Sequence, residues 1–313
     1  MSAETTTDEV LDGVDLTGWT AVVTGASAGL GAETSRALAS KGAHVVMAVR
    51  DPDKGACAAA AVRERHPDAS LEIGVLDLAS LTSVRRFSDW LLERHDRIDR
   101  LINNAGVMVP PLGYTEDGFE TQIGTNHLGH FLLTARVIRA VMAAAPARVV
   151  NLSSRGHVRS GIHWDDPHFR AHDYDKWEGY GQSKTANILF TVELDRRLAA
   201  YGVRAYAVHP GVIMTELSRH LTADDITSVG ARSGPAGLQF KPVEAGAATT
   251  IWAATATELA DTGGIYLEDC HIAVPAVGEI PQEGYRAYAV DPDAASRLWA
   301  WSEEQVGEEF PAP

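Results

Sequence analysis

Tyr180 and Lys184 are the residues in this chain most able to carry out chemistry together, because they lie four apart in a helical stretch and share one face. An ammonium near a phenol favours the phenolate, so we expect Lys184 to lower the pKa of Tyr180 from its ordinary value of about 10. Such a tyrosine could act as a general acid or base near neutral pH. The spacing is common, however, and the pair alone would be better explained as part of a surface helix.

Two further polar residues support a catalytic role for this pair. Ser154 follows a predicted strand, where its hydroxyl could donate a hydrogen bond to a substrate oxygen. Asn126 lies inside a long helical pattern, where an amide side chain is unusual unless it has a packing or catalytic role.

A glycine-rich stretch, T-A-V-V-T-G-A-S-A-G-L-G, runs over residues 20–31. A short buried strand ends at Thr24, and three glycines then open a helical pattern, at Gly25, Gly29 and Gly31. Glycines let a phosphate approach the backbone, and a helix start supplies free N–H groups and a positive dipole end. The stretch therefore predicts a site for a nucleotide pyrophosphate, the alternative being a tight strand-to-helix turn without a ligand.

The rest of the chain alternates strand and helix patterns. Strands are predicted over 44–49, 71–76, 99–102, 147–152, 203–208 and 265–267, and helices over 53–65, 81–94, 116–144, 180–198, 243–256 and 293–304. Near-continuous apolar strands between helices are typical of a parallel sheet covered on both faces. The sequence thus predicts a single-domain α/β, Rossmann-type fold: a doubly wound, mostly parallel sheet with ligands beyond the carboxyl ends of its strands.

The net charge of −15 argues against binding to nucleic acid or to an anionic membrane surface. Both are negatively charged and would repel an acidic protein. No apolar run approaches the roughly 20 residues that span a bilayer, so we expect no membrane association. Residues 1–15 are polar and acidic and are expected to be a flexible tail before a domain over 16–313. The only cysteines, Cys57 and Cys270, indicate a reducing, cytoplasmic compartment.

Two irregular insertions are expected near residues 155–179 and 215–241. The first contains four histidines without a tight ligand spacing, so we expect no metal there: His157, His163, His168 and His172. The second mixes apolar residues with glycines and a proline, and we expect it to be a substrate lid rather than a surface excursion without a role. Its apolar residues are Leu217, Leu221, Ile226, Leu238 and Phe240.

These motifs together resemble the single-domain branch of the short-chain dehydrogenase/reductase family. The resemblance rests on T-G-x-x-x-G-x-G, on N-N-A-G at residues 103–106, on the tyrosine–lysine spacing, and on Pro210–Thr215, which is similar to P-G-x-V-x-T. It implies that Asn126, Ser154, Tyr180 and Lys184 form the family's catalytic tetrad. Ser153 is the neighbour that could be mistaken for the catalytic serine, and the family pattern selects Ser154.

The glycine loop and the resemblance together give a set of cofactor-binding residues: Gly25, Ser27, Gly29, Leu30, Gly31, Arg50, Asp77, Leu78, Asn104, Ala105, Gly106, Tyr180, Lys184, Pro210, Gly211, Ile213 and Thr215. Arg50 follows the second strand, where an acidic residue would bind the adenosine ribose of NAD. A guanidinium binds a phosphate in a bidentate manner, so NADP(H) is expected to be preferred. Asp51 is acidic and close, which keeps NAD(H) possible, and Arg50 could instead only solvate the strand end.

Within this branch the chain most resembles retinol dehydrogenase-like oxidoreductases, through residues 48–51, 125–131 and 180–187. This implies a small-molecule carbonyl or alcohol substrate, with an apolar one expected from the aromatic and aliphatic insertions. The resemblance also implies a homodimer or homotetramer that pairs through the helices holding Asn126 and Tyr180. The alternative is a dinucleotide-sensing or interaction protein on the same fold, with little turnover.

Overall fold

The computed structural model describes residues 1–222, 224, 225, 227, 240–279 and 281–311. Its centre is an eight-stranded sheet in the order β3-β2-β1-β4-β5-β6-β7-β8. All neighbouring strands pair in parallel except β7 and β8, which are antiparallel. The strands are β1 (Thr20–Thr24), β2 (His44–Val49), β3 (Leu71–Val75), β4 (Arg100–Asn103), β5 (Ala147–Leu152), β6 (Val203–His209), β7 (Ile265–Glu268) and β8 (His271–Ile272).

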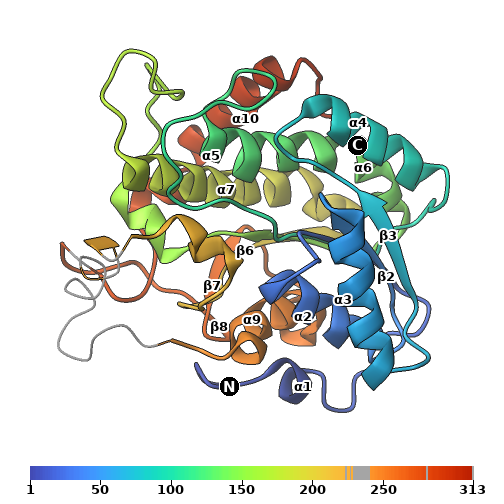
Figure 1. Cartoon of the computed structure of the whole chain (residues 1–313). Helices are drawn as coiled ribbons and strands as arrows, with labels where there is room; N and C mark the ends of the chain where they lie inside the picture. The colour runs from blue at the N-terminus through green and yellow to red at the C-terminus, as the bar shows by residue number, and fades with distance from the viewer. Residues whose placement is uncertain (223, 226, 228–239, 280, 312–313) are drawn as a thin grey trace.

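Helices cover both faces of the sheet, which confirms the predicted doubly wound α/β fold (Figure 1). On one face lie α4 (Leu81–Leu92), α6 (Gly129–Ala143) and α7 (Lys176–Leu198), and on the other lie α2 (Gly29–Ala39), α3 (Pro52–Arg65) and α9 (Val243–Thr255). The central strands are largely apolar because each face of the sheet contributes to a separate hydrophobic core. The last helix, α10 (Pro292–Val306), packs against α7 on its side away from the sheet.

The N-terminal residues differ from the flexible tail expected over 1–15. A short helix, α1 (Thr7–Val10), packs on α2 and α9, and Leu11 is fully buried. Arg36 of α2 donates to Asp8 at 2.7 Å and to Glu33 at 2.7 Å, so a partly buried ion pair joins the two helices. Residues 7–11 therefore pack on the domain, with Thr7, Val10 and Leu11 buried, instead of extending away from it.

The single long helix expected over 116–144 is also wrong at its start. A β-bridge joins Tyr114 to Glu120, and a turn containing Gly118 (φ 83°) precedes the helical residues. Helix α5 (Thr121–Ile123) begins only where Glu120 accepts hydrogen bonds from the next backbone N–H groups. It continues into a π-helical turn, Gly124–Leu128, and then into α6, so Asn126 lies in a widened turn.

The structure describes the first of the two predicted insertions fully and the second only in part. Residues 155–175 begin with the 3-10 helix Arg155–Arg159 and run along α7. Of the second insertion, Glu216–His220 forms a 3-10 helix, whereas Ile226, Leu238 and most of the expected lid lie outside the described residues. Among the helices that the structure describes, none combines the length and apolarity needed to cross a membrane.

Candidate active site

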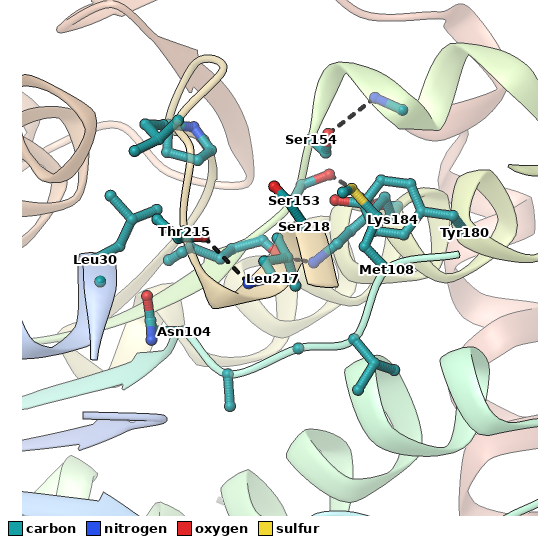
Figure 2. A pocket seen from close by; sticks show the side chains of 18 of the residues that line it. Leu30, Asn104, Met108, Ser153, Ser154, Tyr180, Lys184, Thr215, Leu217 and Ser218 are labelled. Carbon is teal, nitrogen blue, oxygen red and sulfur yellow. Dashed lines mark hydrogen bonds between the residues drawn. The ribbon is translucent and has the colours of Figure 1, made fainter. Parts of the chain in front are cut away.

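A cavity of about 690 Å³ opens beyond the carboxyl ends of β1, β4, β5 and β6. Every residue that the sequence predicts to bind the cofactor lines this cavity, and so do Ser154, Tyr180 and Lys184. Figure 2 shows its two ends, with Leu30 and Asn104 at one and Met108, Ser154, Tyr180 and Lys184 at the other. The fold therefore brings the glycine loop and the tyrosine–lysine pair to one site.

The glycine loop is shaped to hold an anion. Gly25 and Gly29 have φ values of 67° and 54°, which favour glycine, and a Cβ at Gly31 would collide with the Gly25 carbonyl. Helix α2 begins at Gly29, and its N-cap residue, Ala28, offers no side chain to the first N–H groups. Because these groups lie at the cavity without a capping partner, the site fits the pyrophosphate of a dinucleotide.

A buried hydrogen-bond chain links this loop to the turn that holds Asn126. The Thr24 hydroxyl accepts from the backbone N–H groups of Asn104 and Ala105, both at 2.9 Å, and lies 2.8 Å from His130 Nε2. His130 Nδ1 lies 3.0 Å from the Asn126 carbonyl oxygen, and burial lowers the pKa of His130 to about 4. The neutral ring therefore donates from Nδ1 to Asn126 and accepts the Thr24 hydroxyl at Nε2.

Asn126 lies behind the cavity wall rather than on it. Its Oδ1 accepts from the Val107 backbone at 2.8 Å, and its Nδ2 donates to the Val107 carbonyl and to Ser183 Oγ, both at 2.9 Å. A Cβ built on Gly106 would be 3.1 Å from Asn126 Oδ1 and 3.7 Å from Lys184 Nζ. Asn126 thus lies across Gly106 from Lys184 and fixes the backbone that follows N-N-A-G.

Tyr180 and Lys184 project from α7, and both are almost fully buried. Lys184 Nζ lies 5.6 Å from the centre of the Tyr180 ring and donates to the Leu152 carbonyl at 3.1 Å. Burial raises the pKa of Tyr180 to about 12, against a smaller lowering by the hydrogen bond with Ser154, and burial lowers the pKa of Lys184 to about 8. In the protein alone, burial therefore shifts the Tyr180 pKa upward, in the direction opposite to the lowering expected from Lys184.

Ser154 and Ser153 have separate partners. Ser153 Oγ donates to the Lys184 carbonyl at 2.9 Å, whereas Ser154 Oγ accepts from the Gly156 backbone at 3.0 Å and contacts Tyr180. Gly156 is a site residue that the sequence analysis missed, since a Cβ there would be 2.7 Å from the Tyr180 ring. Its position two residues after Ser154 was the available signal.

Arg50 and Asp51 also differ in what they face. Arg50 lines the cavity at the end of β2. Asp51 is the N-cap of α3, and its Oδ1 accepts from the backbone N–H groups of Asp53 at 3.0 Å and Lys54 at 3.2 Å. The Asp51 carboxylate is thus hydrogen-bonded to the first turn of α3, whereas the Arg50 guanidinium lies at the cavity, where a ligand could bind.

The outer part of the cavity is largely apolar, with Met108, Val158, Trp177, Leu217, Leu221 and Phe240 among its lining residues. The sequence analysis missed three cations that also line it, Arg155, Arg159 and Arg219. Arg159 lies 4.5 Å from the Trp177 ring centre, and Arg155 donates to Gln282 at 3.1 Å. Carboxylates line the cavity as well, so its apolar wall is bordered by charges of both signs: Asp175, Glu178 and Glu279.

Comparison with known proteins agrees with this geometry. The model of the short chain dehydrogenase family matches residues 19–226. Retinol dehydrogenase 13 of Homo sapiens is 43% identical over 296 residues, covering 94% of this chain and 86% of the relative. A probable oxidoreductase of Streptomyces lividans is 39% identical over 305 residues, covering 94% and 99%.

Solved structures give the same result. An uncharacterised protein from Mycobacterium paratuberculosis has a TM-score of 0.72 at 38% identity, covering 95% of this chain and 96% of that one. The Pseudomonas aeruginosa RhlG/NADP active-site complex has a TM-score of 0.64 at 26% identity, covering 81% and 95%.

Proposed function

This chain belongs to the short-chain dehydrogenase family and is an NAD(P)-dependent oxidoreductase acting on alcohol or carbonyl groups, and we propose that it is an NADP(H)-dependent carbonyl reductase for bulky apolar substrates. The observation that carries the proposal is the meeting of Ser154, Tyr180 and Lys184 with the uncapped start of α2 in one cavity. This arrangement places an acid/base beside a dinucleotide site. A protein that only senses the dinucleotide would have no use for it.

In the proposed mechanism, Tyr180 donates its phenolic proton to the carbonyl oxygen during reduction. A tyrosine with a pKa of about 12 is protonated at neutral pH, which is the state that this direction requires. Ser154 donates a hydrogen bond to the same oxygen, and the Lys184 ammonium stabilises the phenolate left behind. The glycine loop and Lys184 would hold the dinucleotide, which when bound would supply the hydride that balances this proton. Asn126 holds the backbone at Val107 that borders this site.

The cofactor preference is proposed from Arg50. The guanidinium at the cavity can bind the additional phosphate of NADP, while Asp51 is occupied as the cap of α3. We expect NADPH to bind roughly 10- to 150-fold more tightly than NADH, the scale of one charge-assisted hydrogen bond. Arg50→Ala should remove most of this difference and leave the affinity for NADH unchanged.

Calorimetry at one salt concentration measures both affinities, with Arg65→Ala, an exposed residue in the last turn of α3, as the matched control. Equal affinities for NADH and NADPH in the wild type would refute the cofactor assignment.

The activity itself is tested by following NADPH absorbance with a panel of aldehydes and ketones. The apolar wall around Met108, Trp177 and Phe240 should favour large hydrophobic carbonyl compounds over small polar ones in kcat/KM. A sugar or a short carboxylate as the best substrate would contradict the proposed pocket, and binding of NADPH without turnover of any carbonyl compound would favour the sensing alternative.

A further inference from the structure

A second cluster of functional side chains lies at the other edge of the sheet, where β2 and β3 begin. His44 is the first residue of β2, Glu72 is the second residue of edge strand β3, and His95 follows the end of α4. Parallel strands begin at the edge opposite their carboxyl ends, so this cluster lies at the edge of the sheet opposite the cavity. The proposed catalytic mechanism makes no use of it.

The pairing of the strands brings these three residues to one face. Val46 is in register with Glu72 and Val45 with Leu71, so side chains at 44 and 72 project toward the same side of the sheet. Helix α4 packs on this side of the sheet, and the residues after its end place His95 next to Glu72. Glu72 Oε2 lies 2.9 Å from His95 Nε2 and 3.4 Å from His44 Nε2, and the three ligand atoms lie within 4.8 Å of one another.

The orientation of His44 leaves one ring nitrogen without a hydrogen bond and facing the Glu72 carboxylate, where a cation could bind. Its Nδ1 lies 2.7 Å from Ser70 Oγ, which fixes the ring, while its Nε2 is buried without a hydrogen-bond partner and faces the Glu72 carboxylate. When Nδ1 donates to Ser70, the Nε2 lone pair points toward a carboxylate oxygen, a repulsive contact unless a positive ion separates them. Ser70 would then act as the outer partner that orients a metal-bound imidazole.

The spacing suits a transition metal ion. Ligands about 2.0–2.1 Å from a tetrahedral Zn²⁺ are separated by about 3.4 Å, close to the observed His44–Glu72 distance. The Glu72 and His95 atoms, at 2.9 Å, would have to move apart by about half an ångström to bind the same ion. The other Glu72 oxygen lies 3.6 Å from Arg94 Nε, which leaves Oε2 to the two histidines. Side-chain exposures of 31%, 29% and 14% for His44, Glu72 and His95 leave one side open to water.

We propose that His44, Glu72 and His95 form a binding site for a divalent transition metal ion of the Zn²⁺ type, which joins β2 and β3 to the end of α4. Two imidazoles and one carboxylate favour Zn²⁺, Co²⁺, Ni²⁺ or Cu²⁺ over Mg²⁺ and Ca²⁺. The sequence analysis looked for a metal only among the four histidines of 155–179, and those have separate partners: Ser154, Ser160, Gln305 and Asp166. In the part of the chain that is described, this cluster is where three such ligands converge.

The test uses the full chain, free of affinity tags and treated with a chelator. Titration with Co²⁺ should give one saturable site with visible absorption bands, displaced by Zn²⁺ and unaffected by excess Mg²⁺. His95→Ala and Glu72→Gln should each weaken Co²⁺ binding at least tenfold and abolish the rise in thermal midpoint that Zn²⁺ produces in the wild type. Glu72→Gln keeps the side-chain volume, and circular dichroism shows whether each variant is folded.

The matched control is His172→Ala, which removes a histidine lying 3.0 Å from Asp166 in a pair that lacks a second imidazole. It should bind Co²⁺ as the wild type does. If the wild type binds no Co²⁺, or if His95→Ala and Glu72→Gln bind it unchanged, the cluster is only a set of polar contacts between the two histidines and Glu72, and the proposal is wrong.

Discussion

Burial sets the protonation state of Tyr180 before a substrate arrives. The hydroxyl hydrogen bond with Ser154 lowers the pKa, but desolvation is the larger effect, and the pKa stands at about 12. The buried Lys184, with a pKa of about 8, remains mostly charged at neutral pH. The pair is thus prepared to donate a proton, which suits reduction better than oxidation under neutral conditions.

Tyr180→Phe removes this hydroxyl with little change in volume. We expect turnover of the best carbonyl substrate to fall by ~10²–10⁴, the range of general acid–base catalysis, with NADPH affinity nearly unchanged. Steady-state kinetics and calorimetry measure the two quantities. Tyr201→Phe, at an exposed tyrosine, is the control and should behave as the wild type. A Tyr180→Phe enzyme that kept more than about a tenth of wild-type turnover would exclude Tyr180 as the acid.

Several site residues were predictable from short motifs taken together, and others were not. Gly25 and Tyr180 stand in motifs whose residues are close in sequence, so the local pattern reveals them. His130 and Gly156 act through tertiary contacts, with Thr24 and with the Tyr180 ring respectively. No periodicity in the sequence distinguishes such residues from ordinary core or loop positions.

Among the elements, the strands were predicted closely because both faces of the sheet are buried and the runs are therefore rich in apolar residues. Helix α5 was placed too early because residues 116–120 are compatible with a helix, and only the Tyr114–Glu120 bridge shows that they form a turn. The short α1 was missed because its stability comes from packing on α2 and α9, which a mainly polar sequence does not reveal.

The N-terminal segment should therefore contribute to stability. Leu11 is fully buried against the core that contains α2 and α9, so Leu11→Ala should lower the free energy of unfolding by about 2–5 kcal/mol. Urea denaturation measures this change. Val277→Ala, at a side chain that is 88% exposed, should change it by no more than about 0.5 kcal/mol. If Leu11→Ala changed the free energy of unfolding as little as Val277→Ala, the segment would not stabilise the fold and the flexible-tail hypothesis would be supported.

At the scale of the whole molecule, buried neutral histidines make the fold sensitive to acid. Burial lowers the pKa of His127 and His209 to about 3 and that of His130 and His157 to about 4. Below pH 6.5 these histidines become protonated in the unfolded chain but stay neutral in the folded protein. The free energy of unfolding therefore falls as the pH drops from 6.5 toward 4.

Each such histidine should cost roughly 1.4 kcal/mol per pH unit in this window. Buried carboxyls with raised pKa, such as Glu120 and Glu268, act in the opposite direction and reduce the total. Urea unfolding at pH 7.5, 6 and 5 should show the loss, and His127→Gln should make the slope shallower while His172→Gln, at an exposed side chain, leaves it unchanged. A slope unaffected by His127→Gln would show that this ring does not remain neutral.

Helix α10 has a consequence for how the chain meets copies of itself. Its residues Ala295 and Leu298 cover Ile123 and Leu189, Trp299 packs on Phe131, and Ser302 Oγ lies 2.7 Å from His127 Nε2. The chain's own last helix thus packs on part of the surface of the helices expected to form a subunit interface. Pairing through that part would require the chain to displace α10 and expose Trp299 to water.

We therefore expect light scattering to give a mass of 33.5 kDa, that of one chain. A mass twice as large would show that two copies meet on a surface other than this self-covered one, or that α10 leaves it.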